Sequence, residues 1–161
     1  MSTKESLPVQ IGEVKIGRAG QELNAILGSC IGLGFMYRGK GVYGLAHCLL
    51  ANSGGARSTK GGGRHVDQAI ETLLTEMEVT DDERRDLRCF IAGGANMTKP
   101  VGTEDKRLVG SVNAKFAKTA LRQAKLRVSH IDTGGESGRR VTIDCTTGEY
   151  SIDTIPRLGA K

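Results

Sequence analysis

The chain has 161 residues, of which 38% are hydrophobic and 25% charged, so it has the composition of a globular protein and can bury a core without disulfides or metals. This length predicts one domain over residues 1–161. No apolar run approaches the roughly 20 residues of a membrane-spanning helix and no apolar signal region opens the chain, so we expect a cytoplasmic protein.

In the N-terminal half, apolar patterns predict strands separated by glycine-rich turns. Alternation predicts a strand over Val9–Ile16, and apolar runs predict others over 23–27, 33–37 and 42–50. Five glycines and two serines in residues 52–63 predict an exposed loop with the character of a mobile flap. Helical spacing of apolar residues predicts a helix over Val66–Met77.

In the C-terminal half, a strand over 87–92 ends at Gly93-Gly94, and Ser111 is expected to cap a second helix. That helix is expected to turn Val112, Phe116, Ala120 and Leu121 inward and to carry an outer basic stripe of Lys115, Lys118, Arg122 and Lys125. Further strands are predicted over 127–131, over 140–145 and to an end near Ile155. Because strands and helices do not alternate, the pattern predicts an α+β layered domain and not a doubly wound parallel sheet.

The segment Leu27-Gly28-Ser29-Cys30-Ile31-Gly32 has the features that a nucleophile requires. Its small residues let the chain turn sharply at the end of an apolar strand, which exposes the sulfur and aims backbone N–H groups at an oxyanion. His47 ends a neighbouring predicted strand. If the two strands pair, the imidazole favours the thiolate, which is the form that attacks a carbonyl carbon.

Plainer interpretations stand beside this one. Buried free cysteines are common, and the four cysteines at 30, 48, 89 and 145, with nothing to mark secretion, are expected to be reduced thiols. Cys48, Cys89 and Cys145 are interpreted as core residues. His65 and His130 are interpreted as surface or core histidines, so we expect no metal site.

Two further patterns carry no site. Residues 34–41 approach a phosphate-binding loop, but glycine stands at 41 where a hydroxyl is required, so we interpret them as a hairpin turn. The net charge of +5 favours acidic partners, yet an aromatic content of 4% offers no stacking platform for nucleic acid. We therefore expect no nucleic-acid partner.

Several blocks in order resemble the chemoreceptor glutamine deamidase family of bacterial chemotaxis, CheD. They span nearly the whole chain and are Ile11-Gly12-Glu13, Leu27 to Gly32, His47 with Leu49-Leu50, Val66 to Ile70, Gly93-Gly94-Ala95-Asn96-Met97, Val109-Gly110 with Asn113, and Asp132-Thr133-Gly134-Gly135 with Gly138-Arg139.

The resemblance implies that Cys30 is the catalytic cysteine and His47 the catalytic histidine. In the mechanism that follows, backbone N–H groups at Gly28, Ser29 and Ile31 are expected to hold the oxyanion, and no metal or organic cofactor is needed. The resemblance implies hydrolysis of receptor glutamine side chains to glutamate, sometimes with hydrolysis of glutamate methyl esters. It also implies docking to a CheC-type phosphatase, and a mixed β-sandwich covered by helices that is shared with the cytotoxic necrotizing factor toxins.

Two positions depart from the family pattern. Asn24 stands where the family has a threonine hydrogen-bonded to the histidine, and an amide oxygen can accept from an imidazole N–H, so Asn24 is expected to take that role. Ala51 replaces a usual proline. Two alternatives follow: a regulatory module that binds a signalling partner with weak or no catalysis, and a deamidase of some other protein.

Overall fold

A computed structural model of the chain describes residues 3–57, 61–104 and 108–156. Its elements, in chain order, are β1 Glu5–Pro8, β2 Val14–Gly17, β3 Gln21–Leu27, β4 Ile31–Tyr37, the 3-10 helix η1 Arg38–Lys40, β5 Val42–Cys48, α1 Val66–Glu76, the 3-10 helix η2 Asp82–Asp86, β6 Arg88–Gly93, α2 Val109–Gln123, β7 Arg127–Thr133, β8 Gly138–Asp144 and β9 Glu149–Ile155.

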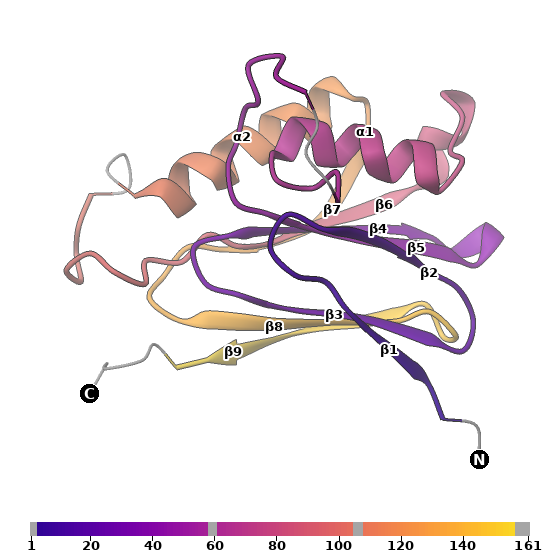
Figure 1. Ribbon diagram of the computed structural model, residues 1–161, viewed down its shortest axis with the longest axis horizontal. Coiled ribbons are helices and arrows are strands. Elements are labelled where there is room, and N and C mark those ends of the chain that lie inside the picture. Colours follow the sequence, from indigo (N-terminus) through magenta and orange to yellow (C-terminus); the bar gives the residue numbers. More distant parts are fainter. Residues whose placement is uncertain (1–2, 58–60, 105–107, 157–161) are drawn as a thin grey trace.

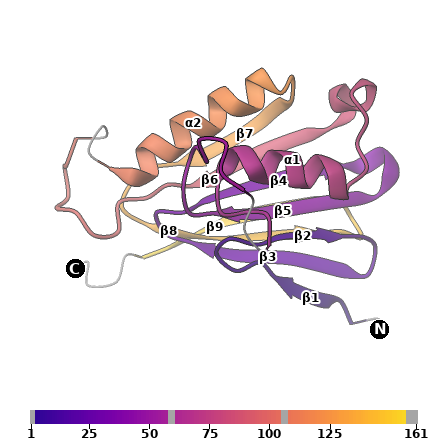
Figure 2. The ribbon, with the colours of Figure 1, turned by 45° about the horizontal axis from the view of Figure 1, so that its top comes forward.

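The strands form two stacked sheets. One has the order β1-β3-β8-β9 and the other the order β2-β5-β4-β6-β7, and each contains one parallel pair, β1 with β3 and β6 with β7. Both helices cover the outer face of the five-stranded sheet (Figure 1), where α1 and α2 lie side by side (Figure 2). The expected α+β fold, a mixed β-sandwich covered by helices, is confirmed.

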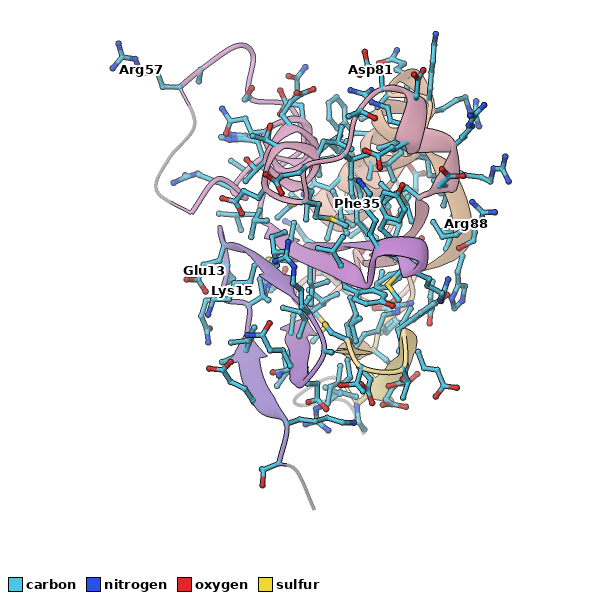
Figure 3. The ribbon with its side chains drawn as sticks, turned by 90° about the vertical axis from the view of Figure 1, so that its right-hand side faces the viewer. Glu13, Lys15, Phe35, Arg57, Asp81 and Arg88 are labelled. Carbon is cyan, nitrogen blue, oxygen red and sulfur yellow. The ribbon has the colours of Figure 1, made fainter. Side chains whose placement is uncertain are left out.

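Strand β4 is buried on both faces, and its sequence suits two different neighbours. Ile31, Leu33 and Phe35 face the helices, and Figure 3 shows Phe35 in the interior of the molecule. The alternate positions face the other sheet and include Gly34, where an added Cβ would lie 2.0 Å from the ring of Phe90. Glycine at 34 therefore makes room for an aromatic ring between the sheets.

Some local predictions are wrong. Of the strand expected over Val9–Ile16, only the part from Val14 forms, because Ile11 and Gly12 make a turn, and β1 is an additional strand. Helix α2 begins at Val109, so Ser111 lies inside it and does not cap it. Val112, expected to face inward, is 48% exposed.

The glycine-rich loop after β5 has no helix or strand where it is described, and residues 58–60 of the expected flap lie outside the described residues. Its first part is tied to α1, because the backbone N–H and hydroxyl of Ser53 both donate to the carboxylate of Asp67. No helix within the described ranges is long and apolar enough to cross a membrane.

Candidate active site at one end of the sandwich

One end of the sandwich, here called the site end, gathers most of the motif blocks found in the sequence. Strands β3, β5, β6 and β7 end there, and β4, β8 and α2 begin there (Figure 1). Cys30, His47, Gly93 and Arg139 are thereby brought to one end from four different strands or turns.

Cys30 lies where the chain crosses from one sheet to the other. Strand β3 of the four-stranded sheet ends at Leu27, and β4 of the five-stranded sheet begins at Ile31. The Cys30 side chain is 7% exposed and belongs to the core between the sheets. The expected position at the end of an apolar strand is confirmed, although little of the residue is open to solvent.

The backbone around Cys30 is held through its carbonyl groups. Gly94 N–H donates to the Cys30 carbonyl at 2.9 Å, and Ala95 N–H donates to the Gly28 carbonyl at 3.0 Å. Gly93 has φ of 101°, and a Cβ added there would lie 2.2 Å from the Cys30 oxygen, so only glycine fits. Both carbonyls thus point towards residues 94 and 95.

The backbone N–H groups of the same turn, unlike its carbonyls, make no hydrogen bonds of this kind in the part of the chain that the structure describes. Those of Gly28, Ser29 and Cys30 donate to no group among the described residues. Ile31 is the first residue of β4 and pairs with Cys48 on one side and Gly93 on the other. Successive N–H groups without protein partners beside a sulfur form a suitable cradle for a negatively charged oxygen.

His47 faces the space between the sheets, as Tyr43 and Leu45 of the same strand do. Its Nδ1 lies 3.0 Å from the carbonyl oxygen of Val9. Because a carbonyl only accepts, Nδ1 carries the hydrogen and Nε2 keeps a lone pair. Burial lowers the pKa of His47, so the ring is neutral at pH 7.

The sheet register places Cys30 and His47 on the same face. Gly32 lies directly opposite His47 in the β4–β5 pair, and Cys30 precedes Gly32 by two residues. Diagonal neighbours of this kind have Cα atoms about 7–8 Å apart, within reach of side chains. No hydrogen bond joins the thiol to the imidazole within the described part of the chain, and burial raises the pKa of Cys30.

Burial therefore acts against the thiolate that pairing with His47 was expected to favour. The other three thiols are more strongly affected: burial raises the pKa of Cys145 to about 11, and that of Cys48 and Cys89 higher still. Cys48 faces the helix layer, as the alternation of the strand predicted. Of the four thiols, Cys30 is the one whose ionisation burial hinders least.

Asn24 lies near His47 but is not its direct partner. The Asn24 amide donates to the Ser6 hydroxyl at 2.9 Å, so the expected bond to the imidazole is not among the hydrogen bonds of the described residues. Its backbone carbonyl accepts from Val9 N–H, and the Val9 carbonyl holds His47. Val9 is the orienting residue that sequence reasoning missed, and since any residue can supply a carbonyl, no side-chain signal could have revealed it.

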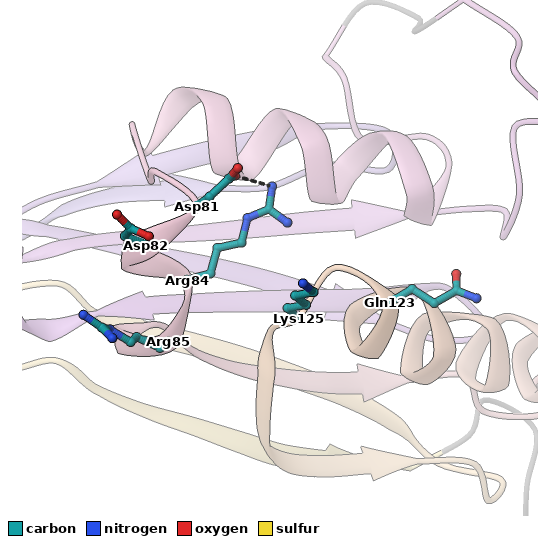
Figure 4. A pocket seen from close by; sticks show the side chains of 6 residues that line it. All are labelled: Asp81, Asp82, Arg84, Arg85, Gln123 and Lys125. Atoms are coloured by element: carbon teal, nitrogen blue, oxygen red, sulfur yellow. Dashed lines mark ion pairs between the residues drawn. The ribbon is translucent and has the colours of Figure 1, made fainter.

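Cavity size does not point to this end. A hollow of ≈ 140 Å³ at this end is lined by His47, Asn24 and Val9, among other residues. A larger one, of ≈ 530 Å³, lies beside the far end of α2 and is lined by Asp81, Asp82, Arg84, Arg85, Gln123 and Lys125 (Figure 4). In the larger hollow, Arg84 pairs with Asp81 and also donates to the Ala124 carbonyl.

Comparisons with known proteins agree on one family. Residues 49–154 match the family model described as CheD chemotactic sensory transduction. A probable chemoreceptor glutamine deamidase CheD 2 of Ruegeria sp. (strain TM1040) is 53% identical, over 95% of this chain and 94% of that protein. A probable chemoreceptor glutamine deamidase CheD of Bdellovibrio bacteriovorus is 34% identical, over 92% of this chain and 94% of that protein.

The match to the family model begins at residue 49, so Cys30 and His47 lie outside it. Among solved structures, the hypothetical protein YfiH of Bacillus licheniformis aligns with a TM-score of 0.45 and 14% identity, over 83% of this chain and 60% of that one.

Proposed function

The chain belongs to the CheD family, and from this membership and the site geometry we propose that it is a chemoreceptor glutamine deamidase with Cys30 as nucleophile and His47 as base. Relatives matched over nearly their whole length are named for this activity, which favours an enzyme over a purely partner-binding module. The observation that carries the residue assignment is the shared face of Cys30 and His47 beside unpaired N–H groups.

In the first half-reaction, Cys30 Sγ attacks the side-chain carbonyl carbon of a receptor glutamine. His47 Nε2 takes the thiol proton as the C–S bond forms, since both groups start neutral. The carbonyl oxygen becomes an oxyanion, which we assign to the backbone N–H groups of Gly28, Ser29 and Cys30. Ile31, which the sequence also suggested for this role, is paired within the sheet. His47 then passes its proton to the nitrogen, the C–N bond breaks and ammonia leaves.

The second half-reaction regenerates the enzyme. His47 removes a proton from water, the hydroxide adds to the thioester carbon, and the C–S bond breaks while Cys30 regains a proton. The product is glutamate. The same steps hydrolyse a glutamate methyl ester when methanol replaces ammonia as leaving group, so this second activity belongs to the proposal.

Other residues take supporting roles. Val9 fixes the tautomer of His47 through its carbonyl, and Asn24 acts through Val9 and not on the imidazole. The chemistry requires neither a metal nor an organic cofactor, and we propose that one domain over residues 1–161 performs it.

The proposed partners are chemoreceptors and a CheC-type phosphatase. We propose that the enzyme acts in the cytoplasm, on glutamines of the receptors' cytoplasmic domains. The phosphatase is proposed from the family resemblance. Exposed apolar side chains near the site support docking of a protein: Leu49 and Leu50 follow β5, Val109 and Val112 lie on the first turn of α2, and Asn113 binds the Leu49 carbonyl.

A single-turnover reaction with a receptor cytoplasmic fragment tests the proposal. Mass spectrometry reads the conversion of amide to acid, and Cys30→Ala is expected to slow it at least about 1000-fold because no covalent intermediate can form. Cys145→Ala is the matched control, since it removes another buried thiol from the same core. Full activity in Cys30→Ala would refute the assignment.

A further inference from the structure

A buried arginine side chain, that of Arg139, lies between the two sheets at the site end. Arg139 is the second residue of β8, lies opposite Leu27 and is only 9% exposed. Directly paired residues share a face, so its side chain enters the space between the sheets, as those of Val141 and Ile143 do. An arginine in that layer requires partners for its N–H groups.

Most of those partners lie near the ends of β6 and β7, two strands of the other sheet. Arg139 Nε donates to the carboxylate of Asp132 at 3.1 Å. Its NH1 group donates to the carbonyls of Gly93 at 3.2 Å and Gly134 at 3.0 Å, with a longer contact to Ser137 at 3.4 Å. One guanidinium thus fixes the end of β6 and the turn after β7.

The same backbone holds the nucleophile. Gly93 lies directly against the Cys30 carbonyl, and Gly94 and Ala95 donate to the Cys30 and Gly28 carbonyls. Gly134 N–H donates in turn to the Gly93 carbonyl, and Asn96 N–H to the Gly135 carbonyl. A short path from the guanidinium to Cys30 therefore runs through Gly93, where only glycine fits.

We propose that Arg139, anchored by Asp132, is a positioning residue of the reaction: it fixes the 93–95 segment and so sets the direction of the Cys30 sulfur and of the N–H groups beside it. This role rests on the proposed function of Cys30. A displacement of about 1 Å at a reacting group costs on the order of 100-fold in rate, so the effect should appear in kcat.

The test compares two neighbouring arginines. Arg139→Gln removes the clamp, whereas Arg140→Gln changes the next residue, which is exposed and points to the opposite face of β8. In folded protein we expect Arg139→Gln to lower kcat by about 10- to 100-fold with KM within about twofold, Arg139→Lys to recover part of the loss, and Arg140→Gln to match wild type.

A second measurement needs no substrate. The rate at which iodoacetamide alkylates Cys30 in native protein reports the accessibility and reactivity of the sulfur. If Arg139 only stabilised the fold, this rate would not change in folded molecules. We expect about tenfold slower alkylation in Arg139→Gln than in Arg140→Gln. An equal rate, or an unchanged kcat in folded Arg139→Gln, would overturn the role.

If Arg139→Gln does not fold, Asp132→Asn and Arg139→Lys decide the matter. Both weaken the clamp and should give intermediate losses, so wild-type kcat and alkylation in both would overturn the inference. A wild-type protein inactive on receptors would count against the proposed function alone, because the alkylation comparison still reports on Arg139.

Discussion

The two ends of the sandwich differ in which polar groups they leave without protein partners. At the end away from Cys30, the Glu83 carboxylate accepts from Tyr37, Lys40 and Thr80, and Arg38 crosses between the sheets to the Gly148 carbonyl. At the site end, the N–H groups of residues 28–30 and the Nε2 atom of His47 have no partner among the described residues.

This contrast is a better guide to chemistry than the shape of the surface. The larger hollow lies at the end where Glu83 and Arg38 are paired, although Arg84 Nε is buried there without a partner. Ser29 is exposed and Gly28 half-buried, so solvent can satisfy their N–H groups in the free protein, and the same groups can bind an oxyanion beside the thiol. The predictions below test whether the two ends really differ in this way.

The largest effect is expected at His47. His47→Asn keeps an amide that can donate to the Val9 carbonyl but removes the base at Nε2, so deamidation should fall by about 100- to 10,000-fold in single-turnover assays. His130→Asn is the control, because His130 is an exposed histidine of β7. A loss below tenfold in His47→Asn would mean that another group acts as base.

The second prediction compares one glycine from each end. Gly93 and Gly20 both have φ near 90–100°, but a Cβ at 93 meets the Cys30 oxygen whereas one at 20 meets nothing within 4 Å. Gly20→Ala should lower the free energy of unfolding by about 1–3 kcal/mol and leave activity unchanged. Gly93→Ala should cost more and also slow deamidation at least about tenfold, since it moves the nucleophile.

Equal losses of stability with equal activity in the two variants would contradict this difference between the ends. Chemical denaturation gives the unfolding free energies, and single-turnover rates measured well below the melting temperature separate misplacement of Cys30 from loss of folded protein.

Sequence reasoning found those parts of the fold that depend on local pattern. Helix α1 follows from its apolar spacing, and β3 to β5 from apolar runs between glycines. Strand β1 was not predicted because Glu5–Pro8 is polar and contains proline, which an edge strand tolerates. Helix α2 begins at Val109 without a side-chain cap, and Gly110 packs closely on Gly94, a contact that the local sequence does not reveal.

For the site too, sequence reasoning reached features carried by local sequence and missed contacts between distant segments. Cys30 and His47 could be proposed because their residue types and positions at strand ends carry chemical meaning, and the family resemblance singled them out. The Asn24–His47 contact followed from analogy with a threonine side chain, but the imidazole binds a backbone carbonyl instead. Arg139 appeared only within a motif, because its role depends on carbonyls at the end of β6 and in the turn after β7.

The smallest effect is expected from the well-paired end. Lys40, Thr80 and Tyr37 lower the pKa of Glu83 from 4.5 to about 2 by donating to its carboxylate. A depressed pKa contributes stability above pH 4.5, and that contribution is lost as pH falls towards 2. Glu83→Gln should therefore lower the melting temperature slightly at neutral pH, lose this difference near pH 2, and leave deamidation unchanged.

Glu76→Gln, on the exposed last residue of α1, is the control. Because the pair with Lys40 is at the surface, concentrated salt should shrink the difference. A Glu83→Gln protein with impaired deamidation would mean that the two ends are coupled, and that polar groups paired with one another can also serve the reaction.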